Sequence, residues 1–399
     1  MFERTQDIKL SPIKQIELEA ARHPDAVSLA QGIPDFDTPE FIKRRVERAL
    51  KRGVVAKYSL SPGLPELREL IEESLEQEGM YYDWEKEILV TAGSIEGITS
   101  SIMAITNPGD EVIIPEPTYT SYREVIKLAG CKPVFVPLDE NERWRFDIEK
   151  YRQAITPRTK AIFYCNPNNP TGTVYTKDQL LQLGDLAEKN DLFLISDEVY
   201  KDFVYDQEKI FSLAEVPELR KRVIRIFSFS KAFAMTGWRI GYLHSDADNI
   251  REIIKVHDSL VTCAPVISQY AAMGALEIGE REVQKFRDQY KTRRDLICQR
   301  LDKLSQVFSY ANPEGAYYVF PKISLKLAEN IKDETGALLT EQGRADSWRL
   351  ALWVLKKAQV ALVPGMAFGP NGEEHVRMSF GRQEEDINKA FDRLEKVFK

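Results

Sequence analysis

Residues 228–242 read SFSKAFAMTGWRIGY and follow the apolar run Val223–Phe227. That run is typical of a buried strand, so Lys231 lies just beyond a strand end. Burial disfavours the charged form of a lysine unless the charge is removed or used. One use is a Schiff base with an aldehyde cofactor, whose phosphate Ser228 and Arg239 could then hold. The alternative is a surface lysine in a glycine-containing loop.

Strand-like runs on both sides of this stretch predict the fold class. Apolar or β-branched runs recur at Glu87–Thr91, Glu111–Pro115, Pro133–Pro137, Lys160–Tyr164, Leu192–Ser196, Val223–Phe227 and Arg239–Leu243. Helical patterns separate several of them, at about 94–105, 120–129, 177–189 and 247–256. This alternation predicts an α/β fold with a largely parallel sheet covered on both faces. Ligands of such sheets bind at the carboxyl ends of the strands.

Three segments at these predicted strand ends are candidates for holding a phosphate or a planar ring. Ser94 and Ile95 follow Gly93 and open a helix, whose first backbone N–H groups can bind a phosphate. Tyr119 lies on a proline-stiffened loop and can stack on a planar ring, although core packing is the commoner fate of a tyrosine. Asn169 lies in a loop with two Asn-Pro pairs, either as a turn residue or as an amide donor to a ligand.

Charged side chains and a glycine complete the candidate set. Asp197 ends an apolar run, and a buried acid needs a cationic partner such as a protonated pyridine nitrogen. Tyr200 follows three residues later and can reach the phenolic oxygen of the same ring. Arg377 lies inside a short apolar strand, which suits a bound carboxylate or a structural ion pair equally well. Gly32 lies in a proline-rich loop, either as a plain connection or as a close approach to a ligand.

Length and composition exclude several classes of protein. The chain has 399 residues, which suggests two or more lobes, and its net charge of −7 argues against general binding to nucleic acid or anionic membranes. No run approaches membrane-spanning length, and the first residues lack an apolar signal core. The four cysteines are widely spaced, as in a reduced cytosolic protein. The four histidines lack metal-ligand spacing, so no metal site is expected.

The C-terminal third has a different pattern from the central part. From about residue 260 it is mostly helical, with helices expected over 281–306 and 384–398. Short strands are expected at Ala316–Phe320, Val360–Val363 and His375–Ser379. Residues 322–346 are rich in charged residues and glycine and should form a surface excursion. The pattern predicts a second, smaller α+β lobe.

Three motifs in this order resemble the class I/II aminotransferases, the fold-type-I enzymes that use pyridoxal 5′-phosphate (PLP). They are Asn166–Gly172, Asp197–Tyr200 and the Ser228–Tyr242 stretch. The similarity extends from Gln31–Pro39 to Val376–Gly381, nearly the whole chain. The resemblance implies a PLP-dependent transferase fold of aspartate aminotransferase type, with a mostly parallel seven-stranded sheet in a large domain and a smaller α+β domain.

The resemblance also implies a role for each candidate residue. Lys231 would carry PLP as a Schiff base and then move the substrate proton, while Asp197 would keep the pyridine nitrogen protonated. Asn169 and Tyr200 would donate to the phenolic oxygen of the ring, and Tyr119 would stack on it. The phosphate would be held by Ser94, Ile95, Ser228 and Arg239. The α-carboxylate of the substrate would bind Arg377, with Gly32 and Asn169 close by.

The organisation implied by the family has three parts. Residues 1–45 would form an N-terminal arm and part of the small domain, residues 46–284 the large PLP-binding domain, and residues 285–399 the rest of the small domain. Tyr58, in an expected exposed turn, resembles a tyrosine that reaches the phosphate of the partner subunit. A homodimer is therefore expected, with amino acids and 2-oxo acids as its small-molecule partners, and the cysteines indicate that it is cytoplasmic.

The substrate is less defined than the cofactor. Related bacterial aspartate-type enzymes often carry a lysine two residues after the position of Gly93, where this chain has Ile95. The change favours apolar or aromatic amino donors, or a broad range of donors. The expected reaction is ping-pong, with 2-oxoglutarate as the acceptor. A PLP-dependent C–S β-lyase would use the same motifs. A non-catalytic PLP-binding regulator is a remote alternative, because the similarity begins within the first thirty or so residues and leaves no room for a DNA-binding domain.

Overall fold

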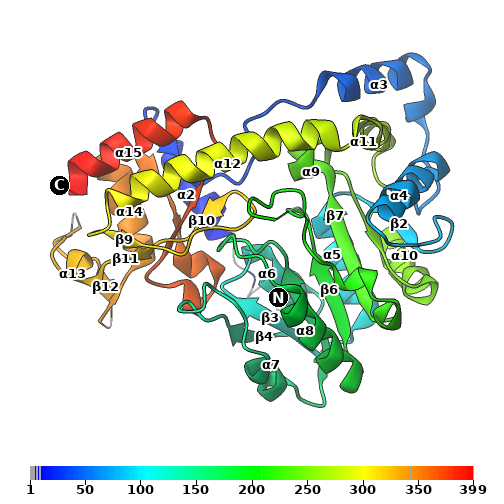
Figure 1. The fold of residues 1–399 in the computed structure, drawn as a ribbon, viewed down its shortest axis with the longest axis horizontal. Helices are drawn as coiled ribbons and strands as arrows, with labels where there is room; N and C mark the ends of the chain where they lie inside the picture. The colour runs from blue at the N-terminus through cyan, green and yellow to red at the C-terminus, as the bar shows by residue number, and fades with distance from the viewer. Residues whose placement is uncertain are drawn as a thin grey trace.

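A seven-stranded sheet forms the centre of the molecule (Figure 1). The computed structural model describes residues 5, 8, 10–207, 209–333, 335–341 and 343–398. The strand order is β2-β8-β7-β6-β5-β3-β4. The strands are β2 (Ile88–Thr91), β3 (Glu111–Glu116), β4 (Lys132–Pro137), β5 (Thr159–Cys165), β6 (Phe193–Asp197), β7 (Val223–Ser228) and β8 (Gly241–His244). Each overlaps one of the seven expected runs, so the α/β fold with a mostly parallel sheet is confirmed.

One strand, β8, runs against the others. It pairs antiparallel with both β2 and β7, whereas the other neighbours are parallel. It begins at Gly241 and not at Arg239 as expected, because Arg239 has a left-handed backbone with φ 54° after a short 3₁₀ turn. Gly241 pairs with Thr91 and with Ser228, the last residues of β2 and β7. The start of β8 therefore lies at the edge where the parallel strands end.

Helices cover both faces of this sheet, as the near-continuous apolar strands require. Side chains alternate along a strand, so Leu89 packs against one layer while Ile88 and Val90 pack against the other. The first layer contains α5 (Ser94–Ile105), α6 (Thr120–Leu128) and α10 (Ala247–Val261). The second contains α4 (Pro65–Gln77) and α8 (Lys177–Lys189). The remaining helices of this part are α3 (Glu40–Lys51), α7 (Ile148–Ala154), α9 (Phe229–Ala232) and α11 (Val266–Ile278).

A smaller α+β lobe combines both ends of the chain, and the long helix α12 (Glu280–Asp302) runs from α11 to it (Figure 1). Its helices are α2 (Pro12–Ala20), α13 (Leu325–Ala328), α14 (Ser347–Ala358) and α15 (Glu384–Phe398). Its strands are β1 (Val27–Ser28), β9 (Phe308–Ser309), β10 (Tyr318–Val319), β11 (Lys322–Ile323), β12 (Thr340–Glu341), β13 (Arg344–Ala345), β14 (Val360–Ala361), β15 (Val363–Pro364) and β16 (Val376–Ser379).

Short sheets connect the two ends of the chain within this lobe. The strand β1 pairs in parallel with β14, and β16 lies between β10 and β15. The division at residues 45/46 and 284/285 stays a prediction, although all seven strands of the large sheet lie between these limits. Within the described residues, we find no helix with both the length and the apolar character needed to cross a bilayer.

Candidate active site

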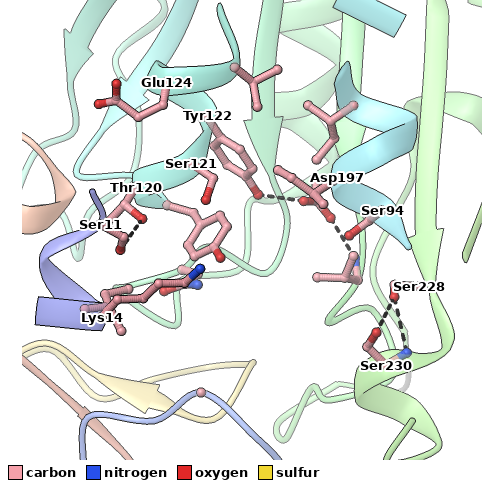
Figure 2. A pocket seen from close by; sticks show the side chains of 18 of the residues that line it. Ser11, Lys14, Ser94, Thr120, Ser121, Tyr122, Glu124, Asp197, Ser228 and Ser230 are labelled. Atoms are coloured by element: carbon pink, nitrogen blue, oxygen red, sulfur yellow. Dashed lines mark hydrogen bonds between the residues drawn. The ribbon is translucent and has the colours of Figure 1, made fainter. Parts of the chain in front are cut away.

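A cavity of about 630 Å³ lies at the edge of the large sheet where its parallel strands end (Figure 2). Eleven of the twelve site residues expected from the sequence line it: Gly32, Ser94, Ile95, Tyr119, Asn169, Asp197, Tyr200, Ser228, Lys231, Arg239 and Arg377. Tyr58 does not line the cavity, and its side chain is 85% exposed. The site therefore combines residues from the N-terminal segment, the large sheet and the C-terminal lobe.

Lys231 lies in the short helix α9, which Ser228 caps by accepting a hydrogen bond from the backbone of Ser230. The Lys231 ammonium group donates to the backbone carbonyl of Gly32 at 2.7 Å. Burial, supported by the positive charges of Arg377 and Arg239, lowers the pKa of Lys231 to about 7. Such an amine is neutral in much of the population near physiological pH, so it can serve as a nucleophile or a base.

Asp197 is the last residue of β6 and is only 3% exposed. The phenol of Tyr122 donates to its Oδ2 at 2.7 Å, and the Val199 backbone N–H donates to its Oδ1 at 3.2 Å (Figure 2). Burial raises the pKa of Asp197 to about 6, although both hydrogen bonds and the charge of Lys231 favour the carboxylate. Among the described residues Asp197 has no direct ion-pair partner. This environment suits a cationic nitrogen of a ligand.

The first turn of α5 forms an anion-binding cradle with Arg239. Gly93 precedes the helix with φ 81°, and the N–H groups of Ser94 and Ile95 have no acceptor within the helix. A side chain at Gly93 would place its Cβ 2.4 Å from Nη2 of Arg239, so the guanidinium packs directly on the glycine backbone. Helix N–H groups beside a guanidinium are suited to a phosphate.

Two serines flank this cradle. The hydroxyl of Ser228 donates to the hydroxyl of Ser230 at 2.9 Å, and both side chains are buried at the cavity wall (Figure 2). Ser228 was expected at the site, whereas Ser230 was not. Hydroxyl groups donate readily to phosphate oxygens, so the pair extends the anion-binding surface.

Arg377 lies in β16 with 2% of its surface exposed. It donates to Oδ1 of Asn169 at 3.0 Å and to the backbone carbonyl of Ala30 at 2.7 Å. Its guanidinium lies over the Tyr318 ring, 4.3 Å from the ring centre. Its Nε is buried and has no hydrogen-bond partner among the described residues. A buried guanidinium with an unused donor is suited to a carboxylate of a ligand.

Tyrosines pack around the loop that carries Gly32. The hydroxyl groups of Tyr200 and Tyr318 lie 2.9 Å apart, and Tyr317 donates to the carbonyl of Gly32 at 2.9 Å. A Cβ at Gly32 would lie 2.1 Å from the Tyr318 hydroxyl, so no larger residue fits without movement. The close approach that the structure shows at Gly32 is to Tyr318, whose hydroxyl lies beside that of Tyr200, and an approach of Gly32 to a ligand stays a prediction.

Several cavity residues were missed from the sequence. Tyr122 lies three residues after Tyr119, and their rings are 5.4 Å apart in an edge contact. That helical spacing was the one signal for Tyr122. Helix α2 lines the cavity through Ser11, Lys14 and Glu17, and no local pattern indicates this, because its position depends on contacts with distant residues.

The donor set fits PLP. The cradle at α5 matches a phosphate, Asp197 a protonated pyridine nitrogen, and the low pKa of Lys231 an amine that can react with an aldehyde. The ring of Tyr119 is half-buried at the cavity wall and offers a surface for stacking.

The chain is similar to known aminotransferases in sequence and in fold. Residues 24–394 match the family model "Aminotransferase class I and II". An aspartate aminotransferase from Pyrococcus abyssi is 37% identical over 100% of this chain and 98% of its own, and aromatic-amino-acid aminotransferase 2 from Thermococcus litoralis is 36% identical with the same coverage. The structure of Thermus thermophilus aspartate aminotransferase with maleate has a TM-score of 0.90 and 36% identity, covering 100% of this chain and 99% of that one.

The match extends over nearly the whole chain in sequence and in structure, and the residues that line the cavity fit PLP. The chain belongs to the class I and II aminotransferases and is a PLP-dependent enzyme of that family.

Proposed function

We propose that this aminotransferase moves the amino group of an L-amino acid to a 2-oxo acid such as 2-oxoglutarate in a ping-pong reaction, with apolar, aromatic or broad donor specificity. The observation that carries the proposal is the position of Lys231 in one cavity with Asp197 and Arg377. The relatives named above act on aspartate or aromatic amino acids, and the Thermus enzyme was solved with maleate, a dicarboxylate. The names of these relatives support amino transfer over the C–S lyase reaction.

The cofactor is proposed to be held at four points. Backbone N–H groups of Ser94 and Ile95 bind the phosphate together with Ser228 and Arg239. Tyr119 would stack on the ring, and Asn169 and Tyr200 would donate hydrogen bonds to its phenolic oxygen, which would favour the ionised oxygen. Asp197 would accept a hydrogen bond from the ring nitrogen and keep it protonated. Bound PLP supplies an aldehyde that links to amines and a cationic ring that accepts the electrons of the substrate Cα–H bond.

Arg377 and Lys231 would then control the transfer of the proton from Cα of the substrate. Arg377 binds the substrate α-carboxylate through two parallel hydrogen bonds and so fixes the orientation of Cα. Lys231 would act as the base that takes the proton from Cα and gives it back within the site. This step needs Lys231 neutral, which its pKa of about 7 allows near neutral pH, and Asp197 ionised, which its pKa of about 6 allows above that value.

Assembly and location follow as further parts of the proposal. The site is completed by the partner subunit's Tyr58 in a homodimer, which agrees with the high exposure of Tyr58 and of Leu60, two residues away. All four cysteines are free thiols, which fits a cytoplasmic protein.

The test is a half-reaction with an amino donor alone. Holoenzyme mixed with L-phenylalanine should release one equivalent of phenylpyruvate per site, with loss of the aldehyde-form absorbance, which returns when 2-oxoglutarate is added. A panel of L-aspartate, L-glutamate and L-leucine would then order the donors. Catalytic release of pyruvate and ammonia from L-cystathionine, without stoichiometric conversion of the cofactor, would instead identify a β-lyase.

A further inference from the structure

A buried histidine connects the helix that begins at the proposed phosphate cradle to the segment that carries Tyr58. His257 lies in α10, which packs beside α5 (Figure 1), and its side chain is fully buried. Its Nδ1 lies 3.0 Å from Oε1 of Glu96 in the first turn of α5, and its Nε2 lies 3.0 Å from the backbone carbonyl oxygen of Ser61. The ring therefore bridges two segments that both belong to the proposed cofactor sites.

Both of these contacts need a proton on the histidine. A carboxylate oxygen and a carbonyl oxygen are acceptors only, so each ring nitrogen of His257 must donate. A neutral imidazole has one N–H group, whereas the imidazolium has two. Two hydrogen bonds from this ring therefore require the imidazolium form, with the carboxylate of Glu96 as its counter-charge.

A second buried histidine, His244, has the opposite surroundings. Its Nε2 lies 3.4 Å from Nη1 of Arg225, which is a donor, and its Nδ1 has no hydrogen-bond partner among the described residues. Burial, supported by the positive charge of Arg225, holds the pKa of His244 well below its usual range. His244 is thus neutral and gives an internal comparison for His257 in the same protein.

Glu96 fixes the backbone at the start of α5. Its Oε2 accepts a hydrogen bond from the Ala92 backbone N–H at 3.1 Å, and its Oε1 also accepts from the hydroxyl of Ser100 at 2.6 Å. Because Ala92 precedes Gly93, this carboxylate holds the turn that leads into the cradle. A carboxylate in this turn also repels a phosphate at the same helix end, and a cationic His257 would offset that repulsion.

The other contact of His257 anchors the segment that carries Tyr58. The hydroxyl of Ser61 donates to Oδ1 of Asp258, the residue after His257, at 2.7 Å. Helix α10 therefore holds Ser61 through both its carbonyl and its hydroxyl group. Tyr58 lies three residues earlier and is 85% exposed. The anchor thus leaves the Tyr58 side chain accessible to another subunit.

We propose that His257, protonated on both ring nitrogens, is a positioning residue for PLP. Through Glu96 it fixes the start of α5, which would bind the phosphate in its own subunit. Through Ser61 it fixes the segment that would carry Tyr58 to the phosphate in the partner subunit. The inference rests on the proposed phosphate cradle and homodimer, and it names a residue that would connect the two cofactor sites of the dimer.

Nitrogen NMR of the holoenzyme with isotope-labelled histidine tests the protonation state. The chain has four histidines, and the spectra of His257→Gln and His244→Gln assign the two buried ones. At about pH 7.5, both ring nitrogens of His257 should have the chemical shifts of N–H groups, whereas His244 should show one protonated and one bare nitrogen. A neutral ring at His257 would overturn the proposal.

Two variants separate the two contacts. His257→Asn places an amide near the position of Nδ1 and keeps donation to Glu96, whereas His257→Gln places one near Nε2 and keeps donation to Ser61. The dissociation constant of PLP should rise about tenfold in His257→Gln, because a charge-assisted hydrogen bond behind the cradle is lost.

The effect of His257→Asn should depend on Tyr58. The dissociation constant of PLP should rise about threefold in this variant, and the rise should vanish in a Tyr58→Phe background, where the hydroxyl that the anchor positions is already absent. An equal rise in both backgrounds would show that the contact with Ser61 does not act through Tyr58.

His244→Gln is the matched control, because it also replaces a buried histidine but lies at the far end of β8 from Gly241, and it should leave the PLP affinity unchanged. Thermal unfolding shows whether each variant is folded. A PLP dissociation constant within about twofold of wild type in folded His257→Gln, beside a weakened Gly93→Ala, would overturn the positioning role alone. If Gly93→Ala also bound PLP as tightly as wild type, the proposed cradle would be wrong and the inference would fall with it.

Discussion

Burial changes the pKa of two residues in opposite directions at one site. It raises the pKa of Asp197 to about 6 and lowers that of Lys231 to about 7, because it disfavours the charged form of each. The protein by itself thus weakens the charges of both groups. A cationic ring nitrogen beside Asp197 and an aldehyde at Lys231 would each offset the unfavourable burial of a charge. This explains why both residues face a ligand cavity and not the closed core.

Asp197→Asn separates the proposed catalytic role of this carboxylate from the stability that the protein loses by burying it. PLP should still bind, but the rate should fall at least about 100-fold because the ring nitrogen loses its proton acceptor. The apoprotein should become more stable above pH 6, by on the order of 3 kcal/mol, because ionisation of Asp197 in the folded state is unfavourable there. Below about pH 4 both proteins carry a neutral group and the gain should vanish.

Turnover kinetics and thermal unfolding of the apoproteins at pH 4 and pH 8 measure these effects. Unchanged kinetics in Asp197→Asn would refute the role given to Asp197. If the stability of the Asp197→Asn apoprotein relative to wild type did not rise between pH 4 and pH 8, burial would not be the cause of the raised pKa of Asp197.

Tyr122→Phe tests the hydrogen bond that holds Asp197. The bond favours the carboxylate, so its loss should raise the pKa of Asp197 further. The proposed reaction requires the carboxylate, so the acidic limb of the pH–rate profile should move to higher pH, together with any pH-dependent change in the cofactor absorbance. Tyr175→Phe is the control, because its hydroxyl is buried without a hydrogen-bond partner among the described residues. Identical profiles for the Tyr122 and Tyr175 variants would show that the hydrogen bond from Tyr122 does not tune Asp197.

At the scale of elements, the large sheet sets the site by ending several strands at one edge. The end of β6 carries Asp197, and the end of β7 leads through Ser228 to Lys231. The strand β8 is antiparallel to its neighbours, so its first residue, Gly241, lies at this edge, and Arg239 lies two residues before it. The helix α5 then directs its N-terminus toward the cavity, where the helix dipole favours an anion.

Gly93→Ala tests this junction between β2 and α5. The backbone φ of 81° disfavours alanine, and the new Cβ would displace the guanidinium of Arg239. We expect the dissociation constant of PLP to rise about tenfold, as for loss of one charge-assisted hydrogen bond. Gly109→Ala is the matched control, because Gly109 has φ 93° but open space around it. Equilibrium dialysis with PLP should distinguish the two variants, whose stability losses should be similar, and equal affinities would contradict the proposed cradle.

The local pattern of apolar residues predicts most of the helices and strands but not how they pair and pack against one another. The run Glu111–Pro115 is within one residue of β3, because a buried strand is apolar along its length. The direction of β8 and the left-handed Arg239 depend on pairing with β2 and β7, which a local run does not encode. The position of α2 depends on Ser11 meeting Thr120, 109 residues away. Lys14, Glu17 and Tyr122 were therefore missed, whereas residues at strand ends were found.

At the scale of the whole molecule, the cavity lies between two lobes formed from distant segments. Arg377 comes from the C-terminal lobe and donates to Asn169 of the large domain and to Ala30 near the N-terminus. This cluster links the proposed carboxylate site to both lobes. One expected residue, Tyr58, lies outside the cavity of its own chain, so the role proposed for it would require a second subunit.

Complementation between two variants tests the shared site. Lys231→Ala and Tyr58→Ala should each have low activity as homodimers, and sedimentation should show a dimer for both. Mixed dimers place an intact Lys231 with an intact Tyr58 in one of their two sites, so co-expression should restore about a quarter of the wild-type activity. Activity no greater than the average of the two homodimers would show that Tyr58 does not act across the interface.

The most direct test of the account is the visible absorbance and turnover of Lys231→Ala, compared with wild type and with Lys189→Ala as a surface control. With added PLP, the wild type and the control should show the absorbance of a lysine-linked cofactor and should transaminate. Lys231→Ala should lack that absorbance and give no turnover above background, while unfolding at a similar temperature. A Lys231→Ala protein with normal absorbance and normal turnover would contradict the central claim that this lysine carries the cofactor.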